Sequence, residues 1–420
     1  MLVDLNIRNY KSLRHADLRN LPQFSVMVGA NASGKSNFAD ALDFLSVVSR
    51  SGLAAAVRAK GGYENICFRR ARRSKADIEF SLAADLAFGV PPSRRVAAPG
   101  EPVRLRFRYS FAFKAKGEAI RAEYEVTRER FVIHQPGGGR GHLEIARVGQ
   151  DVQVVAFPGE REWGFPLPPR DFLEGFVQRA RLPEDELLWP TRLRDIVPFW
   201  ELAEFLGGCR VYQISPETAR QPGIPERSPE LGRYGENLPA AVDYLSRNER
   251  GAFDELVSHL RHAVSTMETL DTDYVETKQL GLFFKERGMR RWYAQDVSDG
   301  TLKTVSMFLP LVDPRVRIVA IEEPENSLHP WILRHFMDVC KTRSDEKQIF
   351  VTTHSPVAVS EVPVESLFIV RRSKGETEIQ RLHALFPEAE QVIRQELYGL
   401  GEYWDSGAIS GVPGADVDVE

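Results

Sequence analysis

The stretch that decides the fold begins at residue 24 and reads Phe24-Ser-Val-Met-Val28-Gly29-Ala30-Asn31-Ala32-Ser33-Gly34-Lys35-Ser36. Its apolar beginning predicts a buried strand, and the part from Gly29 onward matches the pattern G-x-x-x-x-G-K-[ST]. Apolar residues then recur at helical spacing at Phe38, Leu42, Leu45 and Val48. Strand, glycine-rich loop and helix in this order predict a phosphate-binding loop rather than a turn that matches by chance.

Each part of this loop has a chemical task. Its glycines let backbone N–H groups turn inward around phosphates, and the following helix adds its positive N-terminal end. Lys35 supplies a charge for the β- and γ-phosphates, and Ser36 a hydroxyl for Mg²⁺. The residues expected to contact ATP here are Gly29, Ala30, Asn31, Ala32, Ser33, Gly34, Lys35, Ser36 and Asn37.

A second segment, Arg317 to Pro324, reads as an apolar central strand that ends in two carboxylates, Glu322 and Glu323. Such strand ends are where α/β sheets place ligands. We expect Glu322 to face the hydrated Mg²⁺ and Glu323 to act as the base for the attacking water. A solvated acidic turn is the alternative, which the phosphate-binding loop upstream disfavours.

A third segment, Val297 to Leu302, precedes a helix expected to run through Leu311. Ser298, Asp299 and Gly300 at a helix start are also ordinary capping residues, so the segment alone does not establish a binding role.

A fourth segment, Gln348 to Pro356, reads as another apolar strand and ends at His354. A lone histidine is usually structural. At the end of a strand that follows the carboxylate strand, however, it can donate a hydrogen bond to a γ-phosphate or to the attacking water.

Together these segments resemble the ABC-type ATPases of the RecF/OLD/SMC group, and most of all its stand-alone, defence-associated type, the "AAA family ATPases". The resemblance assigns Walker A, signature, Walker B, D-loop and switch histidine to Gly29–Ser36, Ser298–Leu302, Ile318–Glu323, Pro324–Pro330 and His354, respectively. The opening Asn9–Ser12, in an expected first hairpin, and the closing Leu400–Ile409 also match this group.

Three features depart from the wider ABC pattern. The signature reads Ser-Asp-Gly-Thr, although Ser298 and Gly300 are kept as the groups that would meet a partner's γ-phosphate. Glu322 stands where Asp is commoner, so the carboxylate lies one methylene further out. No clear Q-loop glutamine exists, and Gly61–Asn65 is only a weak candidate.

The resemblance implies an α/β fold, a P-loop NTPase of ABC-type head architecture with mixed β-sheets and a helical lobe that carries the signature. We expect residues 1–158 and 313–410 to form the ATPase lobe, residues 159–312 the helical lobe and residues 411–420 a disordered tail. It also implies Mg²⁺ as cofactor and a homodimer that sandwiches ATP against the signature motifs.

The coarse pattern agrees with this division. Leu105, Phe107, Tyr109, Phe111 and Phe113 alternate as on one face of a strand. Helical patterns follow at Phe172–Ala180, Leu193–Leu206 and Leu238–Leu270. No sustained heptad appears, so a compact lobe is expected instead of a coiled coil.

Composition sets further bounds. The net charge of −4 does not indicate a general nucleic-acid binder, and no apolar run is long enough to span a membrane. An amphipathic first strand and three cysteines without metal-like spacing favour a cytoplasmic protein. Two basic clusters could contact nucleic acid, Arg69–Lys75 and Lys285–Tyr293. A solvated loop is the favoured interpretation of the first, and packing within the lobe is equally open for the second.

Two function classes remain. One is a regulatory or sensor ATPase for a separate effector, such as a nuclease, in antiphage defence. The other is a RecF-like ATPase that acts on DNA in repair or DNA loading. The chain after His354 is too short for the Toprim nuclease domain of OLD proteins, and Glu323 disfavours a module that only binds nucleotide.

Overall fold

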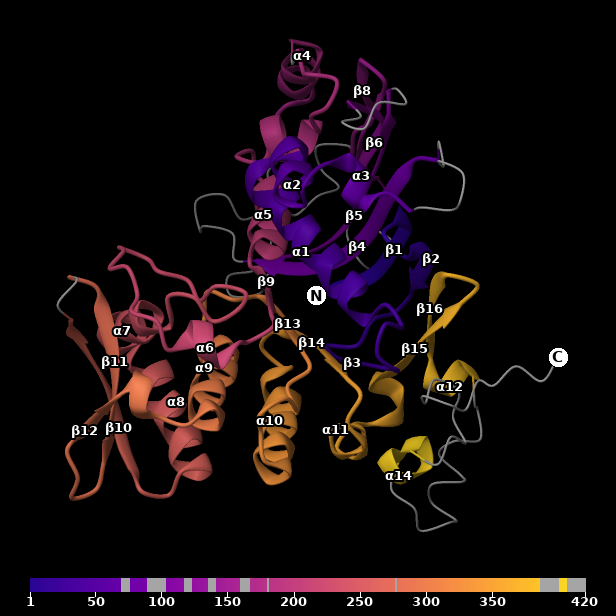
Figure 1. Ribbon diagram of the computed structural model, residues 1–420. Helices are drawn as coiled ribbons and strands as arrows, with labels where there is room; N and C mark the ends of the chain where they lie inside the picture. The colour runs from indigo at the N-terminus through magenta and orange to yellow at the C-terminus, as the bar shows by residue number, and fades with distance from the viewer. Residues whose placement is uncertain are drawn as a thin grey trace. The chain divides into compact units, whose positions relative to one another are not determined.

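The computed structural model describes residues 1–68, 76–88, 103–116, 123–134, 141–158, 167–179, 181–275, 278–385 and 400–405. The chain forms two compact units, each built from stretches far apart in the sequence. Figure 1 labels the helices and strands. Unit 1 comprises Met1–Pro22, Ala32–Gly208 and Arg371–Gln380. Unit 2 comprises Gln23–Asn31, Cys209–Val370 and Arg381–Glu420.

Unit 1 contains an antiparallel sheet in the order β2-β1-β4-β5-β6-β7-β8. Its strands are β1 (Leu2–Tyr10), β2 (Leu13–Leu18), β4 (Ile78–Phe88), β5 (Val103–Ala115), β6 (Tyr124–His134), β7 (Leu143–Val148) and β8 (Asp151–Ala156). The hairpin expected at the start of the chain is confirmed as β1–β2. The alternating side chains from Leu105 to Phe113 are all buried, as their spacing predicts.

The helices of unit 1 are α1 (Lys35–Ser51), α2 (Leu53–Ala59), α3 (Tyr63–Ile66), α4 (Arg170–Arg179), the π-helix η2 (Trp189–Leu193) and α5 (Phe199–Gly207). Aromatic side chains fasten α1 to the sheet. The ring of Phe44 lies 5.3 Å from that of Phe80 and 5.4 Å from that of Tyr10. Such pairs add about 1 kcal/mol each beyond their buried area, so the helix that follows the phosphate loop rests on a rigid support.

Unit 2 is built on parallel strands in the order β15-β3-β14-β13-β9. They are β3 (Phe24–Val28), β9 (Cys209–Tyr212), β13 (Ile318–Glu322), β14 (Gln348–Thr353) and β15 (Leu367–Ser373). Every residue of β3, β13 and β14 is buried, which explains why these strands are mostly apolar. β15 is followed in the chain by β16 (Glu376–Arg381), and most residues of β16 belong to unit 1.

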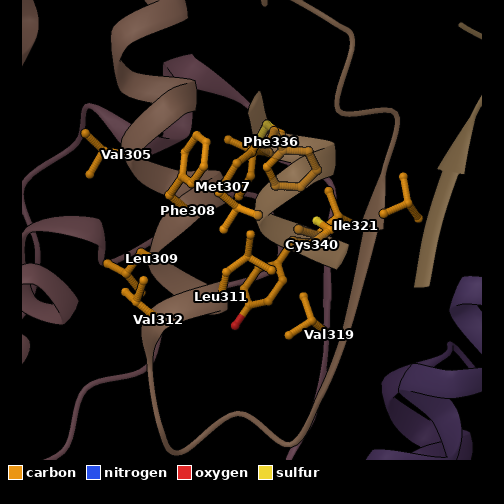
Figure 2. Packing of buried hydrophobic residues seen from close by; sticks show 14 of the residues in the cluster. Val305, Met307, Phe308, Leu309, Leu311, Val312, Val319, Ile321, Phe336 and Cys340 are labelled. Carbon is orange, nitrogen blue, oxygen red and sulfur yellow. The ribbon is translucent and has the colours of Figure 1, made fainter. Parts of the chain in front are cut away.

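The longer helices of unit 2 are α7 (Leu238–Asn248), α8 (Arg250–Ala263), α9 (Asp299–Val312) and α10 (Pro330–Arg343). Shorter ones are α6 (Pro216–Ala219), η3 (Ala294–Asp296), α11 (Pro356–Ser360), η4 (Val364–Ser366), α12 (Leu382–Leu385) and α14 (Leu400–Asp405). Figure 2 shows the core between them, where Phe308 of α9, Ile321 of β13 and Phe336 of α10 belong to one buried cluster.

The prediction of a helical pattern through Leu270 is wrong at its end. Helix α8 stops at Ala263, and β10 (Met267–Tyr274) pairs with β11 (Leu280–Glu286), which pairs with β12 (Arg291–Tyr293). Pairing with the buried face of β11 outweighs the local periodicity that extended the helix. The segment before the signature is therefore mixed rather than helical, and the expected domain bounds stay a prediction.

Several other predictions fall on residues outside the described ones, namely Arg69–Lys75, Ala180 and the tail from residue 411. In the part of the chain that is described, no helix is both long and apolar enough to cross a membrane. Cys67, Cys209 and Cys340, all within the described residues, are not joined in disulfides.

Candidate functional site

The candidate site begins at the carboxyl edge of the parallel strands in unit 2. Strand β14, which precedes His354, lies between β3 and β13, with Thr353 beside Val28 and Thr352 beside Glu322. Neighbouring strands are about 4.8 Å apart, so the ends of β3 and β13 are separated by about 10 Å. One sheet edge thus carries the start of the phosphate loop, the histidine and the carboxylates.

The phosphate loop itself is divided, since Gly29–Asn31 belong to unit 2 and Ala32 onward to unit 1. Within unit 1 the loop turns at Gly34, whose φ of 110° favours glycine. A β-carbon at Gly34 would overlap Oγ1 of Thr377, which donates a 2.9 Å hydrogen bond to the carbonyl of Ser33. The turn into α1 is therefore supported by a side chain of β16 that the sequence motif does not include.

The N-terminal motif Asn9–Ser12 also holds α1. Tyr10 donates a hydrogen bond of 2.7 Å to the carboxylate of Asp40, which also pairs with Lys11 at 2.5 Å and Lys60 at 2.6 Å. Burial opposes ionisation of Asp40, but Lys60 and the other partners outweigh burial and lower its pKa to about 2. This network fixes the helix behind Lys35, which is itself buried.

A cavity of about 340 Å³ lies beside this helix in unit 1. Among its lining residues are Lys11, Ser12, Asn37 and Asn65. Asn37 donates a hydrogen bond of 2.5 Å to the Ser12 hydroxyl. In the weak Q-loop candidate, the side-chain amide of Asn65 already has a partner, because it donates a 2.9 Å hydrogen bond to the carbonyl of Gly61.

The two carboxylates after β13 differ in environment. Glu322 is 2% exposed, and its Oε1 accepts a 2.7 Å hydrogen bond from Arg233, while its buried Oε2 has no hydrogen-bond partner among the described residues. Glu323 is half-buried, has a φ of 47° and accepts a hydrogen bond of 3.0 Å from Asn326. A non-glycine residue in this left-handed region costs about 1 kcal/mol or more, and such strain concentrates at functional sites. An unpartnered, buried carboxylate oxygen fits a hydrated Mg²⁺.

A buried lysine, Lys303, contacts the turn that carries these carboxylates. Nζ of Lys303, in α9, donates to the backbone carbonyl of Glu323 at 3.3 Å. Burial lowers the pKa of Lys303 to about 8, against the opposing charges of Glu325 and Glu323. The helix that begins at the signature is thus tied directly to the turn after Walker B.

His354 is held by the D-loop. Oε1 of Glu325 accepts hydrogen bonds from the Thr353 hydroxyl at 2.9 Å and from the His354 N–H at 2.8 Å. The same oxygen lies 3.1 Å from Nδ1 of His354, whose side chain remains 41% exposed. The carboxylate thus lies beside Nδ1 without a hydrogen bond to it, and Nε2 remains for a ligand.

The signature segment forms the first turn of α9. The Ser298 hydroxyl accepts a 3.3 Å hydrogen bond from the Thr301 N–H, so the capping role and the expected binding role fall on the same group. Arg220, just after α6, donates to the carbonyl of Gln295 at 3.0 Å and to the Asp299 carboxylate. A β-carbon at Gly300 would lie 3.1 Å from the carbonyl oxygen of Ser327 in the D-loop.

Of the closing motif, only Leu400–Asp405 lies within the described residues, and this part docks beside the histidine segment. In α14 the N–H of Gly401 donates to the Ser360 hydroxyl at 3.2 Å, and a β-carbon at Gly401 would overlap the carbonyl of Pro356. Trp404 is 3% exposed. This part of the motif therefore supports α11, the helix that starts after His354.

Two of the four basic residues in the second cluster are paired with carboxylates. Lys285 pairs with Glu268 at 3.0 Å, and Arg291 pairs with Asp273 at 2.8 Å and Asp271 at 3.3 Å. These contacts support packing of the three-stranded sheet over nucleic-acid binding at this segment. No group of three or more metal-binding side chains is placed to hold an ion within the described part of the chain.

Known proteins resemble this chain at two levels. Residues 24–360 match the family described as "AAA domain, putative AbiEii toxin, Type IV TA system". No curated protein matches.

Solved structures of SMC heads are among those similar to it. The "SmcHead bound to the C-winged helix domain of ScpA" is 14% identical, with a TM-score of 0.47, over 90% of this chain and 97% of that one. The "SMC head domain from Thermotoga maritima" is 13% identical, with a TM-score of 0.40, over 90% and 98%. An Smc head with an extended coiled coil, bound to the C-terminal domain of ScpA derived from Pyrococcus furiosus, is 12% identical, with a TM-score of 0.45, over 93% and 99%.

Proposed function

Because this chain belongs to the AAA domain family matched by residues 24–360, we propose that it binds and hydrolyses ATP as an ABC-type ATPase. The phosphates would be held by the backbone of Gly29–Ser36, the side chain of Lys35 and Asn37. Ser36 and Glu322 would hold Mg²⁺, which supplies positive charge to the transferring phosphoryl group.

One observation carries this proposal. The strand that ends in the phosphate loop, the strand that ends in His354 and the strand that ends in Glu322 and Glu323 are consecutive in one parallel sheet. Their carboxyl ends share the edge at which open α/β sheets bind ligands. A solvated acidic turn would have no need of a buried Glu322 or of the backbone strain at Glu323.

The chain's own groups divide the chemistry. Glu323 would accept a proton from the attacking water or orient it, a role worth about 10²–10⁴ in rate. His354, oriented by Glu325, would donate a hydrogen bond to the γ-phosphate. The cavity lined by Lys11 and Asn37 is of the size that accommodates part of a nucleotide.

A second copy of the chain would complete each site. Ser298 and the backbone of Gly300 stand at the start of a long helix, where N–H groups and the helix dipole favour a phosphate. In a two-fold dimer, the signature of each copy would close over the ATP of the other. ATP would then hold the dimer together, and its hydrolysis would release it.

The biological output would be a conformational change that a separate effector reads. The family description names a toxin and a type IV TA system, which supports a role beside a second component. We propose that this chain is the regulatory subunit in antiphage defence and that its effector is a separate protein such as a nuclease. The three cysteines, which form no disulfide within the described residues, support a reducing, cytoplasmic location.

A RecF-like role on DNA is the second candidate, and one pocket in unit 1 favours it. A cavity of about 400 Å³ is lined by the stacked rings of Phe172 and Phe176 and by three arginines, Arg179, Arg181 and Arg192. Among the described residues that line this cavity, Asp171 alone is acidic. Aromatic faces beside arginines suit a stacked base and its phosphate.

The deciding experiment measures ATP turnover and molar mass in solution for the wild type, Glu323→Gln and the exposed control Glu365→Gln. The proposal predicts turnover in the wild type and the control, and an ATP-bound dimer without turnover in Glu323→Gln. Turnover unchanged by Glu323→Gln would contradict the assignment of the base.

A binding assay with single-stranded and duplex DNA over a range of salt concentrations distinguishes the regulatory role from the DNA role. Salt-dependent binding that is lost in Arg179→Glu but kept in Lys285→Glu would favour the DNA role. Absence of DNA binding by a protein that hydrolyses ATP would favour the regulatory role.

A further inference from the structure

Arg233 is held rigidly at the carboxyl edge of the parallel strands. Its carbonyl accepts a 2.8 Å hydrogen bond from the N–H of Gln213, and the carbonyl of Tyr234 accepts one of 3.0 Å from Ser215. Gln213 directly follows β9, which pairs with the Walker B strand, Tyr212 lying beside Ile321. The backbone of Arg233 is thereby fixed next to the end of β13.

From this position Arg233 reaches the metal-side carboxylate. Its Nη2 donates a 2.7 Å hydrogen bond to Oε1 of Glu322. The Glu322 side chain is 1% exposed and the Arg233 side chain 24% exposed, so water screens the pair little. Charge-assisted bonds of this kind are stronger than neutral ones and fix geometry.

The two oxygens of Glu322 are thus unequal. Oε1 has a cationic donor, whereas Oε2 is buried and has no hydrogen-bond partner among the described residues. A buried carboxylate oxygen in this condition is costly unless a ligand satisfies it.

Arg233 is important because the side chain of Glu322 is longer than that of an aspartate. Glutamate has one more rotatable bond than the aspartate commoner at this position, so an unrestrained carboxylate would occupy several rotamers. A donor fixed by the backbone of a neighbouring segment removes that freedom. Because a single buried carboxylate also needs a positive partner, Arg233 both neutralises and orients it.

We infer that Arg233 is a positioning residue for the Walker B carboxylate, holding Oε1 of Glu322 so that Oε2 is presented to the hydrated Mg²⁺ of bound nucleotide. The inference rests on the proposed ATPase function. It explains how a glutamate can serve where an aspartate is commoner, and it assigns a role to an arginine outside every motif of the sequence.

The same segment extends this arrangement to the signature. Arg220, thirteen positions before Arg233 in the printed sequence, bonds to Gln295 and Asp299 at the start of α9. One loop between β9 and α7 therefore touches both the carboxylate of one ATP site and the signature that would serve the other.

The test is a double-mutant cycle of Arg233→Ala and Glu322→Asp, with Arg233→Lys as the conservative variant. The main readout is the affinity for a fluorescent, non-hydrolysable ATP analogue with and without Mg²⁺, measured by anisotropy. Turnover as a function of Mg²⁺ concentration is the second readout. Arg210→Ala, which breaks the ion pair with Glu230 near the same strands, is the matched control, and thermal unfolding verifies that each variant folds.

In Arg233→Ala the Mg²⁺-dependent gain in analogue affinity should fall by about tenfold or more, as for other groups that orient metal ligands. Affinity without Mg²⁺ should stay within about twofold, and Arg233→Lys should recover part of the loss. In the Glu322→Asp background the Arg233→Ala change should cost little, because the shorter carboxylate no longer extends to the guanidinium.

Three results would contradict the inference. Equal losses from Arg233→Ala in the wild-type and Glu322→Asp backgrounds, or Mg²⁺-dependent binding unaltered by Arg233→Ala, would overturn it while the ATPase function stands. A wild type that gains no analogue affinity from Mg²⁺ would overturn the proposed metal site and this inference together.

Discussion

Oε1 of Glu325 lies 3.1 Å from Nδ1 of His354 and accepts a 2.8 Å hydrogen bond from the backbone N–H of the same histidine. Glu325 therefore fixes the main chain of His354 and places its carboxylate beside the ring, although Nδ1 has no hydrogen-bond partner among the described residues.

Replacement of Glu325 by alanine should lower kcat by about tenfold to a hundredfold and change KM less than about threefold, because the ring of His354 loses its orientation but the phosphate loop is untouched. Steady-state kinetics of Glu325→Ala and the exposed control Glu365→Ala measure this. Equal kcat values for the two variants would show that Glu325 does not orient the histidine.

Loss of Arg220 should weaken ATP-dependent dimer formation rather than ATP binding by a single copy of the chain. Its guanidinium fixes the segment before α9 through Gln295 and Asp299, so Arg220→Ala should loosen Ser298 and Gly300. In the Glu323→Gln background, we expect ATP to convert the protein to a dimer, and added Arg220→Ala to raise the ATP-dependent dimer dissociation constant about tenfold or more. Molar mass over a range of protein concentrations reports this.

The control for this prediction is Arg247→Ala, which removes an exposed ion pair with Asp243 on α7. Affinity for ATP analogues in the monomer should be the same for both arginine variants. A weaker monomer affinity in Arg220→Ala would point to a role in the site of its own copy.

The sequence predicts the parts of the site whose signal is local. β3, the loop and α1 are contiguous, and the carboxylates and the histidine each follow an apolar strand directly. The α/β P-loop fold expected from them is confirmed, because buried parallel strands and a glycine turn leave strong local patterns. What the sequence predicts for the roles of these residues remains a proposal.

The supporting residues escape prediction because their partners are distant in sequence. Arg233 and Glu322 are 89 positions apart, and Thr377 supports Ser33 across 344 positions. No periodicity or motif spacing encodes such a pairing, which arises only once β9 lies beside β13 and β16 approaches the loop. The same holds for β10, whose strand state depends on its pairing with β11.

The turn at Gly34 should tolerate no side chain. Its φ of 110° costs an alanine about 1–3 kcal/mol, and the added β-carbon would also overlap Thr377. Gly34→Ala should therefore weaken ATP-analogue binding by about tenfold or more. Gly62→Ala is a matched control, since its φ is 104° but nothing lies within 4 Å of its β-carbon position. Equal losses of ATP-analogue binding in Gly34→Ala and Gly62→Ala would mean that the overlap with Thr377 adds nothing to the cost of backbone strain.

The Asp40 network should make stability depend on pH in acid. The pKa of Asp40 falls from 3.8 to about 2 on folding, so its contribution is complete above 3.8 and is lost as the pH falls through about 2. This shift corresponds to about 2 kcal/mol at neutral pH. Denaturant unfolding of Asp40→Asn should show this deficit at pH 7 and a shrinking one toward pH 2.

Asp43→Asn is the control for that measurement, because Asp43 shares Lys60 at 2.6 Å but is 26% exposed. The loss of stability in Asp43→Asn should be smaller than in Asp40→Asn. A deficit for Asp40→Asn that is constant from pH 7 to pH 2 would mean that the carboxylate is not the stabilising form.

The docking of α14 should matter for turnover although it is remote from the motifs. The β-carbon of Gly401→Ala would meet the backbone carbonyl of Pro356, which cannot move aside as a flexible side chain could. We expect α14 to detach, Trp404 to gain exposure to water, and kcat to fall several-fold, because α11 and the segment with His354 lose a buried support. Gly251→Ala on α8, where the added carbon meets nothing within 4 Å, should leave kcat unchanged. Hydrogen exchange of α11 and steady-state turnover together check this, and faster exchange with unaltered kcat would confine α14 to a structural role.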